Sequence, residues 1–200
     1  MKKQTIVVFD FDGTITVKDS FVEIIKFSKG KWRCYAGFLL FAPLLVAMKL
    51  KLYPNGKVKQ QIFSFFFKET KLTDFNAMCE NFAGKNFPSF INLESLSTIE
   101  KHKQSDDKIL IISASIESWV RHFAEKLGII GILCTKIEID KNKCLTGKFS
   151  TANCYGQEKV NRLLAAFPNR NDYYLIAYGD SRGDKEMIDF ADEGYYNKFK

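Results

Sequence analysis

Apolar and polar positions along the chain form blocks that indicate strands and helices in turn. Short, almost continuous apolar segments lie at residues 6–9, 108–113, 131–135 and 173–178, with a shorter one at 195–196. Segments that are apolar on both faces are typical of strands buried in a parallel sheet. Helical periodicity fills the intervals at 89–103, 116–127, 157–167 and up to 191, and residues 136–150 alternate like a hairpin. The pattern predicts a doubly wound, Rossmann-like α/β fold with right-handed crossovers.

Residues 18–87 interrupt this α/β pattern with helical periodicity alone. Asp19 and Ser20 are typical N-cap residues for a helix over 21–27, which Gly30 would end. Further helices are expected at 57–68, after a turn at 54–56, and at 72–87, before Pro88. The sequence therefore predicts a core domain formed by residues 1–17 and 88–200, with an all-helical cap domain, residues 18–87, inserted into it.

The predicted cap contains an apolar run of fifteen residues, 34–48, that carries no charge. A membrane-spanning helix needs about 20 predominantly apolar residues, and Pro43 stands in the middle of this shorter run. Lysine, arginine, Trp32, Tyr35 and Tyr53 flank it, which favours an interfacial helix or a shallow hairpin over a span. Packing of the run inside the cap is the alternative interpretation.

Charge is distributed unevenly along the chain, which has a net charge of +7. Residues 24–68 contain no Asp or Glu and nine of the 30 basic residues. This asymmetry indicates an anionic partner, either an anionic membrane contacted by residues 32–53 or an anionic substrate. Nucleic acid is not favoured, because the bases flank leucines instead of lining a groove interleaved with stacking aromatic residues.

Composition narrows the class of protein further. An apolar fraction of 46% excludes a disordered chain. The five cysteines are an odd number without a C-x-x-C pair, which argues against a disulfide framework or a zinc site and favours a reducing compartment. The N-terminal residues lead directly into the first strand, so we expect no cleaved signal peptide. The expected location is the cytoplasm, with peripheral contact at the inner face of the membrane.

Polar side chains follow the predicted strands. Asp10 and Asp12 follow the first strand, Ser113 ends the second, and Asp180 and Asp184 follow the fourth. Ala114 and Ser115 are expected to cap the helix at 116–127, and Lys159 stands at the start of another helix. Because the carboxyl ends of parallel strands share one edge of a sheet, these groups should converge. Carboxylates for a divalent cation, with a hydroxyl and a lysine for phosphate oxygens, are what phosphoryl transfer requires.

The same residues resemble the four motifs of the haloacid dehalogenase superfamily of phosphotransferases. Residues 10–14 (Asp-Phe-Asp-Gly-Thr) resemble the first motif, 109–113 the second, Lys159 the third and 179–184 the fourth. The helical insertion after the first motif resembles the cap of the phosphoserine-phosphatase-like branch, subfamily IB. Its apolar run, together with residues 155–160, is similar to phosphatidylglycerophosphatase type C proteins. Gly183 is a departure, because the phosphoserine enzymes usually carry Asn there.

The resemblance implies a Mg²⁺-dependent phosphomonoester hydrolase that forms an aspartyl-phosphate intermediate. A phospholipid headgroup phosphate such as phosphatidylglycerophosphate is the expected substrate, and a soluble phosphoserine-like metabolite is the alternative. A non-enzymatic binding module is a weaker alternative, since it would leave the catalytic set unexplained.

The resemblance also implies a role for each site residue. Asp10 would be the nucleophile and Asp12 the general acid and base. Mg²⁺ would bind Asp10, the main-chain carbonyl of Asp12 and Asp180, with Asp184 orienting its waters. The expected phosphate contacts are Ser113, Lys159 and the amides of Gly13, Thr14 and Ala114, with Asp19 as a further substrate contact. His102 and His122 are expected on helix surfaces, away from the motifs.

Overall fold

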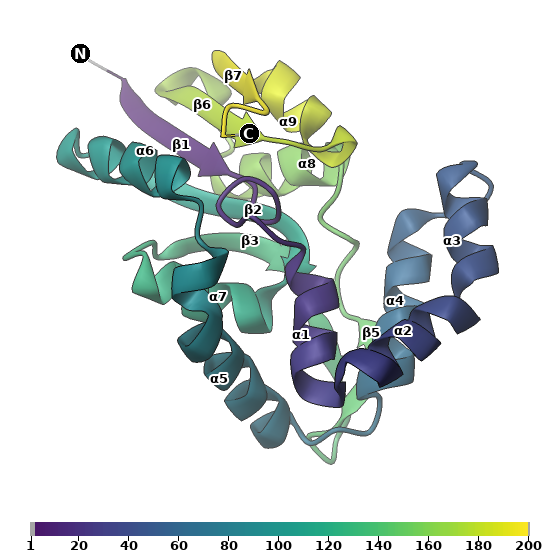
Figure 1. The fold of residues 1–200 in the computed structure, drawn as a ribbon. Coiled ribbons are helices and arrows are strands. Elements are labelled where there is room, and N and C mark those ends of the chain that lie inside the picture. The colour runs from purple at the N-terminus through teal and green to yellow at the C-terminus, as the bar shows by residue number, and fades with distance from the viewer. Residues whose placement is uncertain (1–2, 200) are drawn as a thin grey trace.

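The computed structural model describes residues 3–199, and five parallel strands form its central sheet (Figure 1). The strand order is β3-β2-β1-β6-β7. The strands are β1 (Gln4–Phe9), β2 (Lys108–Ile116), β3 (Gly131–Thr135), β6 (Tyr173–Gly179) and β7 (Glu193–Tyr196). Every pairing within this sheet is parallel, as the alternation of strands and helices predicts. The predicted α/β fold is confirmed.

Alternation along β1 divides the core between the two faces of the sheet. Val7 and Phe9 belong to the apolar cluster on one face, and Ile6 and Val8 to the cluster on the other. The first face is covered by α6 (Leu93–Gln104) and α7 (Glu117–Lys126). The second is covered by α8 (Gln157–Ala166) and α9 (Lys185–Phe190), the latter following a short 3₁₀ turn, Arg182–Asp184. Burial on both faces explains why the strands are almost continuously apolar.

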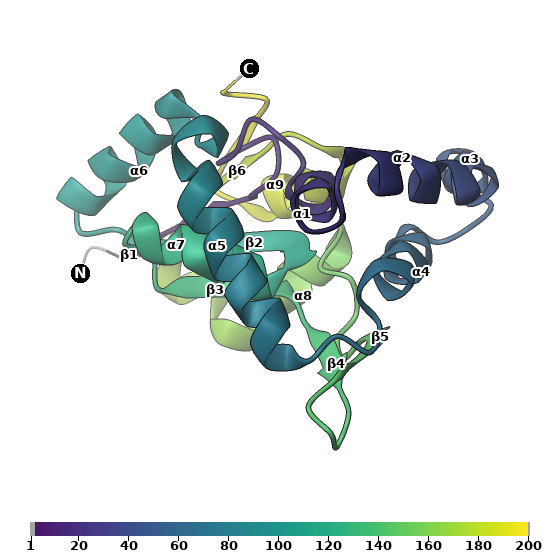
Figure 2. The ribbon, with the colours of Figure 1, turned by 60° about the horizontal axis from the view of Figure 1, so that its bottom comes forward.

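Five helices connect β1 to α6, and Figure 2 shows α2, α3 and α4 projecting to one side of the sheet. They are α1 (Ser20–Lys29), α2 (Lys31–Leu40), α3 (Ala42–Lys49), α4 (Asn55–Phe67) and α5 (Leu72–Phe90). The Asp19 side chain caps α1 by accepting a bond from the Val22 amide at 3.0 Å, and Gly30 ends the helix at a φ of 84°. The sequence predicted both Asp19 as an N-cap residue and Gly30 as the end of this helix.

The apolar run lies in two consecutive helices, α2 and α3, which form a bent pair with an angle of 61° at Phe41. Pro43 stands in the first turn of α3, where its missing N–H costs no intrahelical bond. Within residues 3–199, no single helix is both long and apolar enough to cross a membrane. Only the bent pair, counted together, meets that requirement of length and composition.

The sheet and the inserted helices share one core. Phe123 on α7 contacts Phe82 and Phe90 on α5, and Phe63 on α4 contacts Phe149 on the small hairpin formed by β4 (Ile137–Ile139) and β5 (Leu145–Phe149). These side chains belong to a single apolar cluster that also includes Phe9. The division of the chain into core and cap domains therefore remains a prediction, because one apolar cluster extends through both parts of residues 3–199.

Several predicted helix boundaries are wrong. Helix α4 begins at Asn55, within the turn expected at 54–56. Helix α5 continues through Pro88 to Phe90, and α6 begins at Leu93 instead of residue 89. The Asn92 side chain accepts bonds from the amides of Glu94 and Ser95, which makes it the N-cap. Strand β2 extends to Ile116, so Ser115 does not cap α7.

We expect Phe63→Ala to lower the free energy of unfolding by about 3–5 kcal/mol, because Phe63 is fully buried and its loss leaves a cavity between α4, α5 and β5. Phe65→Ala is the matched control on the same helix. Its side chain is 55% exposed, so the change should be under about 1 kcal/mol. Urea denaturation measures both, and equal losses would contradict the packing of α4 against β5.

Candidate active site

A cavity of about 610 Å³ lies at the carboxyl edge of the sheet, beneath the inserted helices. The parallel register of β1 with β2 and β6 places the ends of these three strands side by side. Six of the predicted catalytic and metal-binding residues line this cavity: Asp10, Asp12, Ser113, Lys159, Asp180 and Asp184. Convergence of these side chains follows from the topology, because all the strands run in one direction.

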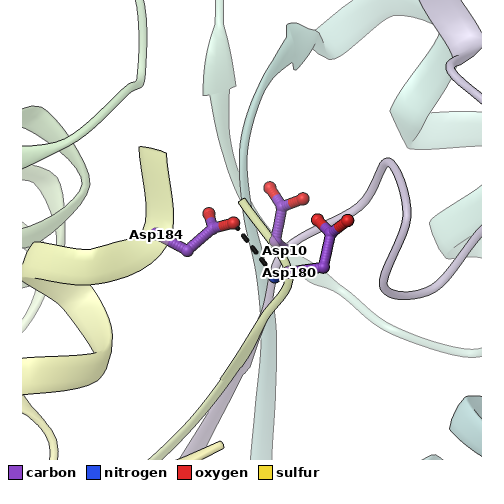
Figure 3. Close-up of side chains that lie close together, drawn as sticks. All are labelled: Asp10, Asp180 and Asp184. Carbon is purple, nitrogen blue, oxygen red and sulfur yellow. Dashed lines mark hydrogen bonds between the residues drawn. The ribbon is translucent and has the colours of Figure 1, made fainter. Parts of the chain in front are cut away.

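Three carboxylates gather at the bottom of the cavity, from the ends of β1 and β6 and the turn before α9 (Figure 3). Ligand atoms of Asp10, Asp180 and Asp184 all lie within 4.8 Å of one another. Gly13 allows this approach, because a Cβ at its position would stand 2.3 Å from Asp180 Oδ2, and its φ of +81° is strained for other residues. An all-oxygen donor set of this kind suits a hard divalent cation such as Mg²⁺.

Lys159 places a buried positive charge between two of these carboxylates. Its Nζ donates to Asp10 Oδ1 at 2.5 Å and to Asp184 Oδ1. Burial alone would lower the pKa of Lys159, but the two carboxylates reverse this effect and hold it above its ordinary value. Burial raises the pKa of Asp10 to about 7 against the opposing attraction of Lys159. Asp10 therefore needs further positive charge to be fully ionised at neutral pH.

Asp184 is fixed by its own turn. One carboxylate oxygen accepts bonds from the Ser181 amide at 2.8 Å, the Ser181 hydroxyl at 2.7 Å and the Asp180 amide at 3.2 Å. Burial would raise the pKa of Asp184, but Lys159 and the Ser181 bonds outweigh it and hold the pKa below its ordinary value. Asp184 is therefore ionised, is held by these hydrogen bonds and pairs with Lys159.

The Asp12 carboxylate turns away from the other three. One oxygen accepts a bond from the Ser20 amide at 2.7 Å, and the other accepts one from the Ser115 hydroxyl. Burial and the neighbouring Asp19 charge raise the pKa of Asp12. Its side chain is therefore separate from the carboxylate cluster, which agrees with a carboxyl group reserved for proton transfer.

The predicted phosphate contacts occupy different places. Ser113 is buried at the cavity, where its Oγ accepts a bond from the Ser115 amide at 3.2 Å, and Gly13 and Ala114 also line the cavity. Thr14 is buried outside the cavity lining, and its hydroxyl has no hydrogen-bond partner within residues 3–199. Asp19 lines the mouth of the cavity while capping α1.

Lys59 and Tyr155 also line the cavity, although the sequence did not single them out as site residues. Lys59 on α4 donates to the Ala114 carbonyl at 2.9 Å and lies 5.2 Å from the centre of the Phe21 ring. The sequence indicated Lys59 only as one of the nine basic residues in 24–68, a segment without Asp or Glu. Tyr155 explains the glycine at position 183, because a Cβ there would stand 2.4 Å from the tyrosine ring.

The two histidines lie outside the cavity, but neither is simply on a solvent-exposed surface. His102 is half-buried, with its ring nitrogens 2.8 Å from Asp107 Oδ2 and 3.1 Å from the Tyr178 hydroxyl. His122 is also half-buried and lies 3.2 Å from Glu125. The expected helix-surface positions are therefore corrected: His102 joins α6 to β6 by its polar bonds.

We expect Lys159→Gln to lower the free energy of unfolding by about 3–5 kcal/mol at pH 8 in EDTA, because two buried carboxylates lose their cation. The loss should shrink toward pH 5. The uncompensated carboxyls would have raised pKa values in the folded state, so folding takes up protons and stability increases as pH falls.

Lys185→Gln is the control for this change, since its ion pair with Asp189 is exposed and should contribute no more than about 1 kcal/mol. Urea denaturation across this pH range measures both variants. A pH-independent loss in Lys159→Gln would contradict charge compensation as the role of the lysine.

Comparisons with known proteins agree with this geometry. A model of the haloacid dehalogenase-like hydrolase family matches residues 7–189. Protein CicA from Caulobacter vibrioides is 32% identical over 195 residues, which cover 98% of this chain and 86% of CicA.

Two solved structures share the architecture. A protein of unknown function from Bordetella pertussis Tohama I has a TM-score of 0.79 at 14% identity, over 94% of this chain and 87% of that one. A phospho-aspartyl intermediate analogue of phosphoserine phosphatase has a TM-score of 0.64 at 17% identity, over 98% and 86%. At these identities the structures show the fold alone. The family model and the similarity to CicA show that this chain belongs to the haloacid dehalogenase-like hydrolase family.

Proposed function

We propose that the chain is a Mg²⁺-dependent phosphomonoester hydrolase that works through an aspartyl-phosphate intermediate. The observation that carries the proposal is the position of Asp10, which lies at the bottom of the cavity in contact with Lys159 and beside Asp180 and Asp184. One of the solved structures with the same fold is a phospho-aspartyl intermediate analogue of phosphoserine phosphatase, which supports the same chemistry.

The donor set fits Mg²⁺, which the carboxylates of Asp10 and Asp180 and the main-chain carbonyl of Asp12 would hold, with Asp184 orienting bound water. When bound, this cation would reduce the charge repulsion between Asp10 and the phosphate. It would also favour the ionised nucleophile, which burial disfavours.

The chain's own residues then account for two steps. In the first, an Asp10 carboxylate oxygen attacks phosphorus, the bond to the leaving oxygen breaks, and Asp12 gives that oxygen a proton. In the second, Asp12 takes a proton from water, which attacks phosphorus and releases phosphate from Asp10. Ser113, Lys159 and the amides of Gly13 and Ala114 would bind the phosphoryl oxygens in both steps.

We expect Asp10→Asn to abolish turnover and the trapping of phosphate on the protein, because the amide is a poor nucleophile. Acid quenching during turnover of a ³²P-labelled phosphomonoester, followed by denaturing electrophoresis, measures the trapped phosphate. Asp189→Asn, an exposed carboxylate on α9, is the control and should behave like the unmodified protein. Normal turnover by Asp10→Asn would sink the covalent mechanism.

We further propose a phospholipid headgroup phosphate, such as phosphatidylglycerophosphate, as the substrate. Above the carboxylates the cavity walls are mainly apolar: Val17, Phe21, Val22, Phe38, Leu45, Met48, Val58 and Ile62 line them. Such walls suit the hydrocarbon part of a lipid that carries the phosphate better than the charged amino acid of phosphoserine. The resemblance of the apolar run and residues 155–160 to phosphatidylglycerophosphatase type C proteins supports the same choice, whereas the resemblance to subfamily IB is equally compatible with a phosphoserine-like substrate. A soluble phosphomonoester remains the alternative.

We also propose contact with an anionic membrane through residues 32–53, at the inner face of the cell membrane, on the outer surface of the bent α2–α3 pair. Trp32, Leu39 and Leu40 are 87%, 76% and 64% exposed, and exposed lysines flank the pair. Leu44 and Leu45 are half-buried and pack against the core cluster, so Leu39 and Leu40 are the leucines available for insertion. Phe38 and Leu45 line the cavity, so the same pair of helices would contact both membrane and substrate.

We expect the double variant L39E/L40E to lose sedimentation with anionic vesicles and turnover of lipid phosphate in mixed micelles, while retaining turnover of a soluble phosphomonoester. Burial of apolar surface contributes roughly 25 cal/mol per Å², and two carboxylates at the same place oppose it. Leu93→Glu is the control, because Leu93 is 77% exposed but stands on α6. Unmodified protein that stays in the supernatant with anionic vesicles at low salt would favour the soluble alternative.

A further inference from the structure

A chain of hydrogen bonds runs from α7 to the Asp12 carboxylate. Trp119 Nε1 donates to Ser20 Oγ at 3.0 Å, Ser20 Oγ lies 3.2 Å from Ser115 Oγ, and the Ser115 hydroxyl donates to Asp12. Ser20, Ser115 and Trp119 are all fully buried. Solvent therefore cannot replace these bonds, and each is specified by the packing of α1, β2 and α7.

When Asp12 is ionised, the direction of every bond in this chain follows from the chemistry of its members. An indole N–H can only donate, so Ser20 Oγ accepts from Trp119. Ser115 uses its one hydrogen on Asp12, which leaves its oxygen to accept the hydrogen of Ser20. The Ser20 amide occupies the other Asp12 oxygen at 2.7 Å. Both oxygens of Asp12 are thus engaged from the side away from the cavity.

An irregularity in β2 explains how this strand supplies two serines with different surroundings. The register of β2 with β3 shifts between Ser113 and Ile116, and the Ser115 amide donates to Ser113 Oγ at 3.2 Å instead of following regular alternation. Ser113 lines the cavity, whereas Ser115 is absent from its lining and contacts Asp12 from behind. Ser115 is therefore placed to act on the side chain of Asp12 without touching the substrate.

We propose that Ser115, held by Ser20 and Trp119, is a positioning residue for Asp12 in the proposed hydrolysis, on which this inference rests. The network would hold the carboxyl in one orientation, so that the proton carried by Asp12 is directed at the leaving oxygen. Loss of the Ser115 bond would let the Asp12 side chain rotate and would slow proton transfer, without removing a phosphate ligand or a metal ligand.

The test compares kcat/KM for two substrates that differ in their need for an acid. An alkyl phosphate leaves as a basic alkoxide that must be protonated, whereas 4-nitrophenyl phosphate leaves as a stable phenolate. In Ser115→Ala we expect kcat/KM for the alkyl phosphate to fall roughly 10- to 100-fold, part of the roughly 10²- to 10⁴-fold that a positioned acid supplies. The loss for 4-nitrophenyl phosphate should stay below about threefold.

Two further variants separate positioning from packing. Ser95→Ala removes another fully buried hydroxyl, which bonds Asn92 and Ile15 away from the cavity, and it should affect both substrates alike. Trp119→Phe keeps an aromatic ring and removes the N–H, so it should give a smaller loss with the same preference for the alkyl substrate. It also keeps the test available if Ser115→Ala does not fold.

Asp12→Asn calibrates the outcomes. In Asp12→Asn, kcat/KM should fall much more for the alkyl phosphate than for 4-nitrophenyl phosphate. If Asp12→Asn behaves in this way but Ser115→Ala and Trp119→Phe lose equally on both substrates, the positioning role is overturned and the proposed hydrolysis stays intact. Absence of Asp10-dependent turnover in the unmodified protein would overturn the proposed function itself, and the positioning role with it.

Discussion

The ion pairs of Lys159 with Asp10 and Asp184 are the interaction on which the rest of the structure depends. All three side chains are buried, where a charge without a partner is strongly destabilising. One ammonium compensates two carboxylates only in part, and Asp180 lies against the same cluster. A divalent cation bound here would add to the charge compensation that Lys159 gives Asp10 and Asp184. A protein selected for stability alone would replace such a cluster with apolar residues, so its retention indicates chemistry.

Glycines make this concentration of charge sterically feasible. A side chain at Gly13 would overlap the Asp180 carboxylate, and a side chain at Gly179 would stand 2.5 Å from Asp184 Cβ. The positions of the acids and glycines in the sequence are therefore one pattern. This is why residues 10–13 and 179–184 are informative as sequences: each segment carries glycines next to its acids, and the parallel pairing of β1 with β6 brings the two segments together.

Features that depend on distant side chains were not predictable in the same way. The strands, the order of the α/β units and the cavity edge follow from local periodicity and the parallel topology. Ser20 and Ser115 contact each other across 95 positions, and Lys59 reaches Ala114 across 55, so no local pattern indicates either contact. Pro88 also misled, because α5 continues past it to Phe90 and the next helix begins only at Leu93, where Asn92 is the N-cap and also donates to the Phe199 carbonyl.

The inserted helices therefore act on the site through two different surfaces. The amide of Ser20, the first residue of α1, holds Asp12, while α2, α3 and α4 supply the apolar walls above it. Any shift of α1 relative to β2 would alter the bond to Asp12 and the shape of the cavity together. Gly30 alone separates α1 from α2 in the sequence, and Lys26 on α1 lies 5.7 Å from the centre of the Tyr35 ring on α2, so contact of the α2–α3 pair with a surface would reach α1 over a short path. Docking of this pair would therefore be linked through α1 to the orientation of Asp12, the proposed acid.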